Sequence, residues 1–521
     1  MIMAEMEIPL VSLTEYMFSW FDQYPDNVAL VDFETERSVT YKELKWLIIK
    51  ASNGLQSLGV NEGDVVCVYL PNSIDYAVVF WALTSFGATM QATNPQYTKD
   101  ELINQFKQCN TQWVITVPSL LNTIKQSRIK SIKEIIVIGG DSNIDNCISL
   151  NKVISLGVGM GLKKAKFDPQ KTVACYVFSS GTTGLPKAVM LSHYNIVANM
   201  VQMRAMNLQP GDDILEFLPF YHIYGLIAIL CCATTFGVKL VIMPKFRPIP
   251  YFAAIEKYQI KLIHVVPPVM VLLAKSPEVK SYDLTCVRKV MCGAAPLSKD
   301  IELKVRDILQ IDFITQAYGL SECLNTNINT ETHHREGSVG RNFAGIKTKI
   351  IDSDTGKTLG VNQDGEVCIR GPQVMLGYLN QPEATSAMIG RDGWVKTGDV
   401  GHLDEDGFLY IVDRFKELIK YKGHQVAPAE LEALLLKHPA IADVGVIGVP
   451  DDEGGELPKA FVVIKNYSNT TSSDIHNYVK ENAAFYKRLR GGIEFIEEIP
   501  KSASGKILRR VLKKRTINSK L

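Results

Sequence analysis

Length, composition and charge place the chain among globular proteins with more than one domain. Its 521 residues exceed the usual size of one domain several-fold, and hydrophobic residues, at 46%, can bury a large core. The formal net charge of +1 disfavours a nucleic-acid partner, because such partners select a basic surface. The ten cysteines form no C-x-x-C pair, which disfavours a zinc site, and no apolar run predicts an integral membrane protein.

The first half of the chain alternates apolar strand patterns with helix-length segments. Residues 75–86 predict a helix, and residues 226–243 predict a buried helix followed by a strand. Runs rich in Val and Ile predict buried strands at 65–70, 113–117, 134–138, 173–178, 239–243 and 262–266. Because parallel sheets are buried on both faces, this alternation predicts layered α/β sheets.

The pattern changes twice towards the C-terminus. Short strands separated by Gly and Asp turns predict a β-rich subdomain at 347–351, 365–369 and 408–412. A compact α+β module follows, with helices at 429–437 and 474–482 and strands at 441–449 and 459–464. We therefore predict an α/β protein with a large N-terminal domain (1–413) and a small, mobile α+β C-terminal domain (414–521).

One loop has the composition of a phosphate-binding site. Ser179–Lys187 follows the predicted strand 173–178 and contains Ser179, Ser180, Gly181, Thr182, Thr183 and Lys187. The glycines let the backbone curl around an anion, the hydroxyls donate hydrogen bonds, and the lysine adds a positive charge. The loop does not match G-x-x-x-x-G-K-[ST], since proline precedes its lysine and alanine follows it, so a P-loop kinase or ATPase is disfavoured.

Together with this loop, several further segments resemble the adenylate-forming superfamily over nearly the whole chain. The resembling segments are 218–224, 293–296, 316–322, 396–399, 413–423 and 500–506. The likeness is greatest to the branch that holds 4-coumarate–CoA ligases, acyl-CoA synthetases and luciferases. It implies an enzyme that uses ATP and Mg²⁺ to activate a carboxylic acid as an acyl-adenylate, passes the acyl group to coenzyme A, and releases AMP and pyrophosphate.

The resemblance also implies roles for individual residues. The candidate catalytic residues are Lys506, which would bridge the carboxylate and the α-phosphate, His222, which would position the acid, Lys187 in the phosphate loop, and Lys416 at a hinge. Glu322 would hold the magnesium ion. The nucleotide would contact Asp399 and Arg414 at the ribose, Tyr318 and Ala294 at the adenine, and also Gln316, Ala317, Ser321 and Lys420. Tyr224, Ala228 and Ala317 would line the acyl pocket, and Lys245, Lys422 and Gly423 would bind CoA.

Three departures from the family pattern leave the acid open. Ala317 stands where glycine is usual, Cys323–Thr326 replaces a run that contains proline, and His424 replaces an aromatic residue. Fatty acids and arylalkenoic acids both remain candidate substrates. The alternatives to an acid–CoA ligase are a luciferase-like monooxygenase, a carrier-loading adenylation domain and a non-catalytic relative that only binds an adenylate.

The last three residues predict a cellular address. Ser519-Lys520-Leu521 is the tripeptide that peroxisomal import receptors bind. We therefore expect the protein in the peroxisome.

Overall fold

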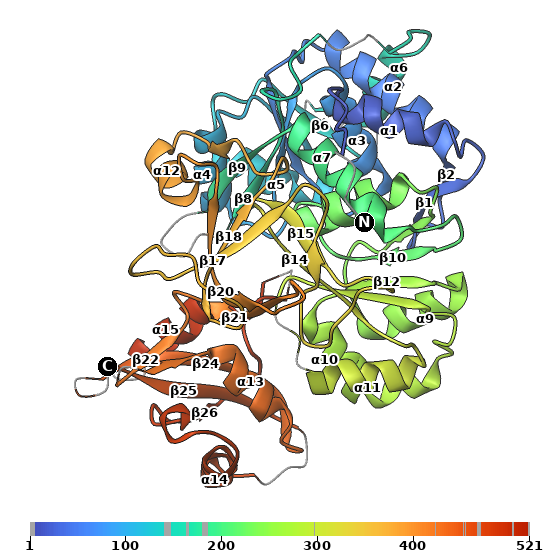
Figure 1. The fold of residues 1–521 in the computed structure, drawn as a ribbon. Helices are drawn as coiled ribbons and strands as arrows, with labels where there is room; N and C mark the ends of the chain where they lie inside the picture. The colour runs from blue at the N-terminus through green and yellow to red at the C-terminus, as the bar shows by residue number, and fades with distance from the viewer. Residues whose placement is uncertain are drawn as a thin grey trace.

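The computed structural model describes most of the chain (Figure 1). It covers residues 6–139, 147–162, 166–179, 186–295, 297, 299–422, 424–451, 453, 455–465, 470–502 and 505–518. Ser180–Thr183 of the predicted phosphate loop, Gly423 of the predicted CoA site and the tripeptide 519–521 lie outside these ranges, so their predicted roles stay predictions.

Two mainly parallel sheets form the large N-terminal body. The first has the strand order β19-β9-β8-β4-β3-β5-β6-β7, with bounds Gly377–Tyr378, Lys187–Ser192, Val173–Ser179, Thr89–Ala92, Val65–Tyr69, Trp113–Thr116, Glu134–Val137 and Ile148–Ser149. The second has the order β16-β15-β14-β13-β12-β10-β11-β1-β2, with bounds Arg341–Asn342, Leu324–Ile328, Thr315–Leu320, Lys289–Cys292, Leu262–Val265, Ile214–Glu216, Leu240–Ile242, Val28–Asp32 and Ser38–Thr40. The predicted α/β class is confirmed.

Helices fill the space between and around these sheets. Helix α3 (Ile74–Ser85) is apolar on every side and contacts strands of both sheets, as expected for a helix buried between two layers. Ser73 caps its start by accepting a hydrogen bond from the Tyr76 backbone N–H. The other helices of this body are α1 (Leu13–Phe21), α2 (Tyr41–Ser57), α4 (Lys99–Cys109), α5 (Pro118–Ser127), α6 (Leu150–Leu156), α7 (His193–Met203), α8 (Cys232–Thr234), α9 (Pro248–Tyr258), α10 (Pro267–Lys275), α11 (Lys299–Leu309) and α12 (Pro382–Met388).

The apolar run after residue 223 is a helix of an unusual kind. Residues Tyr224–Cys231 form a π-helix, η2, which continues into α8 and then β11. Gly225 allows η2 to approach the preceding loop closely, because a Cβ there would lie 2.5 Å from the carbonyl oxygens of Leu218 and Pro219. The predicted order of helix and strand is confirmed, but the π geometry is not visible in an apolar run without periodicity.

A third sheet joins the large body to the C-terminal elements. Its antiparallel strands have the order β17-β18-β20-β21, with bounds Lys347–Ile351, Gly365–Arg370, Val395–Leu403 and Leu409–Arg414. The chain then enters a separate sheet of β23 (His424–Val426), β22 (Ile419–Tyr421), β25 (Gly455–Ile464), β24 (Ile441–Asp451) and β26 (Ile493–Phe495). Helices α13 (Pro428–Leu436), α14 (Ser472–Asn482) and α15 (Arg509–Asn518) accompany this sheet, coloured orange to red in Figure 1.

The small C-terminal body is docked against helices α10 and α11 of the large one. Lys275 Nζ donates hydrogen bonds to the carbonyl oxygens of Leu436 (3.1 Å) and Ile441 (3.2 Å). Lys437 forms an ion pair with Asp300 of α11 at 2.5 Å. These contacts define one pose of the two bodies, and this pose decides which C-terminal residues reach the large body.

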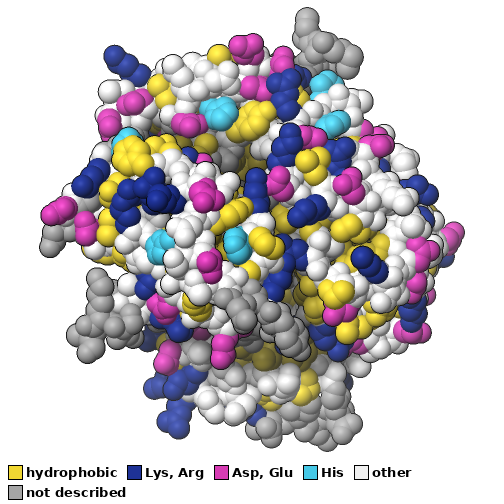
Figure 2. Space-filling model, turned by 90° about the horizontal axis from the view of Figure 1, so that it is seen from below, with side chains coloured by type: hydrophobic (Ala, Val, Ile, Leu, Met, Phe, Trp, Pro, Cys, Tyr) yellow, Lys and Arg dark blue, Asp and Glu magenta, His cyan; other side chains and the backbone are white. Residues whose placement is uncertain are grey.

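Two surface properties bear on the predicted partners. Among the helices that the structure describes, none is both long and apolar enough to cross a bilayer. On the face shown in Figure 2, Lys and Arg side chains are interspersed with Asp and Glu.

Candidate active site

Asp399 is the centre of a buried polar cluster where β14, β20 and β21 meet. Its Oδ2 accepts a hydrogen bond of 2.6 Å from the Tyr318 hydroxyl, and its Oδ1 lies 3.3 Å from Arg414 Nε. The register places Arg414 directly opposite Asp399. Burial raises the pKa of Asp399, while the Arg414 charge and the Tyr318 hydroxyl act against this shift. Tyr318 and Arg414 therefore fix the orientation of the Asp399 side chain.

Lys506 of the C-terminal body reaches this cluster. Its loop packs on the start of α10, since a Cβ on Gly505 would lie 3.0 Å from Val266 Cγ2. Burial and the nearby Arg414 lower the pKa of Lys506 to about 8, while Asp399 and Glu322 favour its charged form. The docked pose thus brings an ammonium group from the C-terminal body to the carboxylates of the large body.

His222 lies beside Lys506 in a defined tautomer. Burial and, to a smaller extent, the nearby Lys506 charge together lower the pKa of His222 to about 3. Its Nδ1 accepts a hydrogen bond from the Tyr224 backbone N–H at 3.3 Å, so the proton of the neutral ring is on Nε2. His222 can therefore donate a hydrogen bond to a carboxylate without acting as a base.

Glu322 and Lys187 are connected through a tyrosine that the sequence analysis missed. The Tyr378 hydroxyl donates to Glu322 Oε1 at 2.8 Å, and Lys187 Nζ lies 4.9 Å from the centre of the Tyr378 ring. Tyr378 is in the short strand β19, which pairs with β9, the strand that begins at Lys187. No spacing in the sequence relates it to the phosphate loop, because the link is a strand pairing between distant segments.

Glu322, the predicted magnesium ligand, is a buried carboxylate in the turn after β14. Among the described residues, no group of three or more His, Cys, Asp or Glu side chains is gathered closely enough to hold a metal ion. Mg²⁺ usually binds through one or two carboxylates plus substrate phosphates and water. Glu322 is 4% exposed and keeps Oε2 free of the Tyr378 bond, so it suits a magnesium ion carried by a polyphosphate.

The predicted nucleotide residues of the second sheet have mixed surroundings. Ala294 adopts a left-handed backbone with φ +73°, a strained conformation that is often found at binding sites. Gln316 Nε2 donates a hydrogen bond to Glu302 Oε2 of α11 at 2.8 Å, so the amide of Gln316 connects β14 to this helix. Glu302 was not predicted. Ala317 and Ser321 are partly buried near Tyr318 and Glu322 along the same strand and turn.

Two of the predicted acyl-pocket residues, Tyr224 and Ala228, lie in η2, and the third, Ala317, lies in β14 of the second sheet. The Tyr224 hydroxyl donates to the Met291 carbonyl oxygen at 3.3 Å. A Cβ on Gly293 would lie 3.4 Å from the Tyr224 ring and 3.5 Å from the Ala317 carbonyl oxygen. Ala228 is buried one turn further along η2. The structure thus brings Tyr224 and Ala317 together.

The predicted hinge lysine, the predicted CoA lysines and Lys420, which was predicted to bind the nucleotide, are exposed at the surface. Lys416 and Lys420 lie just after β21 and in β22, Lys422 is at the end of the β22–β23 hairpin, and Lys245 follows β11. The Lys420 backbone N–H donates to Glu456 of the C-terminal body at 3.0 Å. Beside Lys422, the His424 ring stacks on Tyr486 with ring centres 4.4 Å apart. This pose therefore presents Lys506, and not the hairpin, to the cluster.

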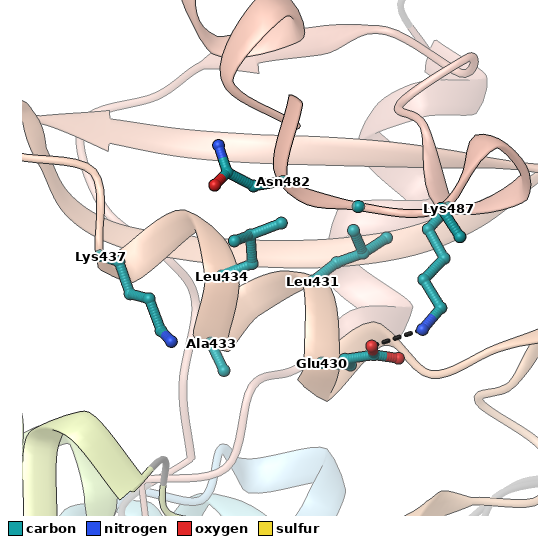
Figure 3. Close-up of a pocket in the computed structure, with 9 residues that line it drawn as sticks. Glu430, Leu431, Ala433, Leu434, Lys437, Asn482 and Lys487 are labelled. Atoms are coloured by element: carbon teal, nitrogen blue, oxygen red, sulfur yellow. Dashed lines mark hydrogen bonds and ion pairs between the residues drawn. The ribbon is translucent and has the colours of Figure 1, made fainter. Parts of the chain in front are cut away.

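A surface pocket of about 350 Å³ lies elsewhere on the C-terminal body. It is lined by residues of α13 and of the segment after α14, with the Glu430–Lys487 ion pair at its edge (Figure 3). It includes none of the predicted site residues.

Comparisons with known proteins identify the family of the chain. The AMP-binding enzyme family matches residues 17–379, and the AMP-binding enzyme C-terminal domain matches residues 430–506. The chain is 39% identical to 4-coumarate–CoA ligase 2 of Oryza sativa subsp. japonica over 534 residues, which cover 98% of this chain and 94% of the relative. It is also 39% identical to 4-coumarate–CoA ligase 1 of Petroselinum crispum over 521 residues, with 98% and 95% covered.

Solved structures share the fold. The anthranilate CoA ligase AuaEII in complex with anthranoyl-AMP is similar over 100% of both chains, with a TM-score of 0.91 and 24% identity. ATP-bound MatB from Rhodopseudomonas palustris is similar over 97% of this chain and 99% of that one, with a TM-score of 0.88 and 24% identity. The chain therefore belongs to the AMP-binding, adenylate-forming superfamily, in its 4-coumarate–CoA ligase-like branch, and is an acid–thiol ligase.

Proposed function

We propose that this acid–CoA ligase activates an arylalkenoic or fatty acid with ATP, and that the Asp399–Lys506 cluster is where the acyl-adenylate forms. The observation that carries the proposal is the docking of Lys506 among His222, Glu322 and Asp399. A carboxylate and a triphosphate repel each other, so adenylation requires a cation between them. Lys506 is the cation that the C-terminal body brings to this place.

In the first half-reaction, a carboxylate oxygen attacks the α-phosphorus of ATP and pyrophosphate leaves. His222 donates its Nε2–H to the carboxylate and orients it, since the acid is already ionised at neutral pH. Lys506 neutralises the charge that builds up between the two anions. Asp399 accepts hydrogen bonds from the ribose hydroxyls, with Arg414 and Tyr318 holding it in place. Magnesium, held at Glu322, would neutralise the phosphate oxygens.

In the second half-reaction, the CoA sulfur attacks the acyl carbon and AMP leaves. We infer that the C-terminal body then turns about the segment after β21, with the domain boundary between residues 413 and 414. Supporting this inference, β21 ends at Arg414, and the next strand, β22, pairs with β25 of the other body. Such a rotation would exchange Lys506 for the hairpin at Lys422 and Gly423, because a hinge needs only a few residues that change their backbone angles.

The products test the proposed reaction. Given ATP, Mg²⁺, CoA and a panel of fatty and aryl acids, the protein is expected to release AMP and pyrophosphate in an acid-dependent way. The reason is that, in the proposed reaction, the acid attacks the α-phosphorus, which releases pyrophosphate and leaves AMP on the acyl group. Chromatography of the nucleotides measures the result, with a reaction without acid as the control. ADP and phosphate as products across the panel would refute the proposal.

The pH dependence of adenylation should report Lys506. Its pKa of about 8 is below the ordinary value for lysine, so the ammonium is present below that pH and is lost above it. The kcat/KM of acyl-adenylate formation should therefore fall about tenfold per pH unit above this pKa, since kcat/KM reports the free enzyme. Lys506→Arg keeps its charge and should move the fall to higher pH. Coinciding profiles for both proteins would contradict this assignment.

The peroxisomal address is a separate proposal that concerns residues 519–521. A fusion that carries a fluorescent protein at its N-terminus should enter peroxisomes, because its C-terminal Ser-Lys-Leu remains available to the import receptor. Removing Leu521 should leave the fusion in the cytosol, while replacing Asn518 by Ala should not. An unchanged punctate distribution without Leu521 would reject the tripeptide as the signal.

A further inference from the structure

Lys275, the last residue of α10, holds two carbonyl oxygens of the C-terminal body, and the proposed reaction does not use it. Its Nζ donates to the carbonyl oxygens of Leu436 (3.1 Å) and Ile441 (3.2 Å). Leu436 is the last residue of α13, and Ile441 is the first residue of β24. The last carbonyls of a helix have no partner within the helix and carry a partial negative charge. Lys275 therefore matches this junction by charge as well as by distance.

A second contact lies beside the first. Lys437 follows Leu436 directly and forms an ion pair of 2.5 Å with Asp300 in the first turn of α11. Helices α10 and α11 pack against each other in the large body (Figure 1). The two contacts thus fix one corner of the C-terminal body, the junction of α13 and β24, to two neighbouring helices.

Lys506 moves together with this corner, because its loop is attached to the same elements. Arg509, at the start of α15, forms an ion pair with Glu432 of α13 at 2.8 Å and donates to the Val446 carbonyl oxygen of β24 at 3.1 Å. The Lys506 backbone N–H donates to Ser502 Oγ at 3.1 Å, which closes the loop on itself. Helix α13 and strand β24 therefore connect the docked corner to the lysine of the candidate active site.

We propose that Lys275 and the Lys437–Asp300 ion pair form a latch that holds the C-terminal body in the pose for adenylation and so positions Lys506. The inference rests on the proposed function, because it assigns the latch to the first of the two proposed half-reactions. A turn that takes Lys506 out of the cluster also takes the rest of its body away from α10 and α11. Both contacts must then break before CoA is used, and the three latch residues touch neither ATP nor the acid.

The latch is weak enough to open. The Lys437 and Asp300 side chains are 49% and 44% exposed, and ion pairs at the surface contribute little to stability. Burial and the charges of Lys465 and Lys304 lower the pKa of Lys275 to about 8, so Lys275 is still mostly charged at pH 7. Contacts of this strength shift the balance between two poses without locking either of them.

The two half-reactions, measured on the full-length protein at pH 7, test the latch. Lys275→Met keeps the apolar stem and removes the ammonium group. It should slow acyl-adenylate formation about tenfold, because this rate follows the fraction of molecules in the docked pose. The conversion of a preformed acyl-adenylate with CoA should be unchanged or faster. Single-turnover pyrophosphate release without CoA and single-turnover thioester formation measure the two rates.

Exchange of charges across the ion pair separates a latch from a structural role. Asp300→Lys and Lys437→Asp place like charges opposite each other, and each should slow adenylation about threefold. The double variant restores the pair in the reverse direction and should recover the wild-type rate. Lys299→Met is the matched control, because Lys299 is in the same helix as Asp300 but pairs with Glu336 of the large body at 2.7 Å. This control should leave both half-reactions unchanged.

The possible results distinguish the latch from the proposed function. If Lys275→Met slows both half-reactions equally or leaves adenylation unchanged, the inference is overturned and the proposed function stands. A double charge exchange that recovers no activity would also overturn the inference, and this test remains open if Lys275→Met does not fold. If the wild-type protein releases no pyrophosphate with any fatty or aryl acid, the proposed function itself is wrong.

Discussion

Lys506→Ala is expected to slow acyl-adenylate formation by about 10²–10³-fold, the usual loss when one charge donor to a transition state is removed. The alanine leaves Glu322 and Asp399 without the cation that the docked pose brings to them. The same variant should still convert a preformed acyl-adenylate with CoA, because Lys506 would leave the site in the second half-reaction. Single-turnover kinetics of each half-reaction measures the two effects separately.

Lys501→Ala is the matched control for Lys506. It lies in the same loop, but its Nζ is bound to Asp443 of the C-terminal body at 2.6 Å. Lys501→Ala should leave adenylation unchanged.

Two other variants should affect the second half-reaction and the change of pose. Gly423→Ile should slow thioester formation and spare adenylation, the reverse of Lys506→Ala, by narrowing the proposed path of the CoA arm. Lys416→Pro should hinder the change of pose. If Lys506→Ala slows both half-reactions equally, the proposed division between two poses is wrong.

Asp399→Ala is expected to have the second large effect, a loss of about 10–10²-fold in kcat/KM for ATP, since hydrogen bonds to a charged group contribute about 1.5–3 kcal/mol. The variant removes the acceptor proposed for the ribose. It also leaves the Tyr318 hydroxyl and Arg414 Nε without the carboxylate that now holds them. The KM for ATP should therefore rise, which steady-state kinetics at saturating acid and CoA would show.

Two further variants separate nucleotide binding from a general loss of structure. Asp364→Ala removes an exposed carboxylate that pairs with His402, a residue of the strand β20 that also carries Asp399. This variant should leave the KM for ATP unchanged. Tyr318→Phe keeps the ring but loses the hydrogen bond to Asp399. Its KM for ATP should lie between that of the wild-type protein and that of Asp399→Ala. A normal KM for ATP in Asp399→Ala would show that the ribose is bound by other residues.

Several site residues could not be found from the sequence for a physical reason. Tyr378 bonds Glu322 and Glu302 bonds Gln316, and each pair comes together only when the strands and helices that carry its members pack. The π geometry of η2 also had no signal, since its apolar run has no period that separates it from an α-helix.

The sequence by itself determined the α/β class, the order of the elements and the adenylate-forming family. These properties are encoded locally, because hydrophobic period, turn residues and contiguous motifs such as 179–187 depend on neighbours in the chain. The sequence also predicted Asp399, Tyr318 and Lys506 as site residues, but it did not predict which of them are in contact.

Only the tertiary structure decided that combination. The pairing of β20 with β21 places Arg414 opposite Asp399, and the docking of the C-terminal body on α10 brings Lys506 to both. Strand register and domain pose arise from many weak contacts between distant segments, and no local pattern encodes them. The pKa values of Lys506 and His222 follow from the same packing, because burial and neighbouring charges exist only once the chain is folded.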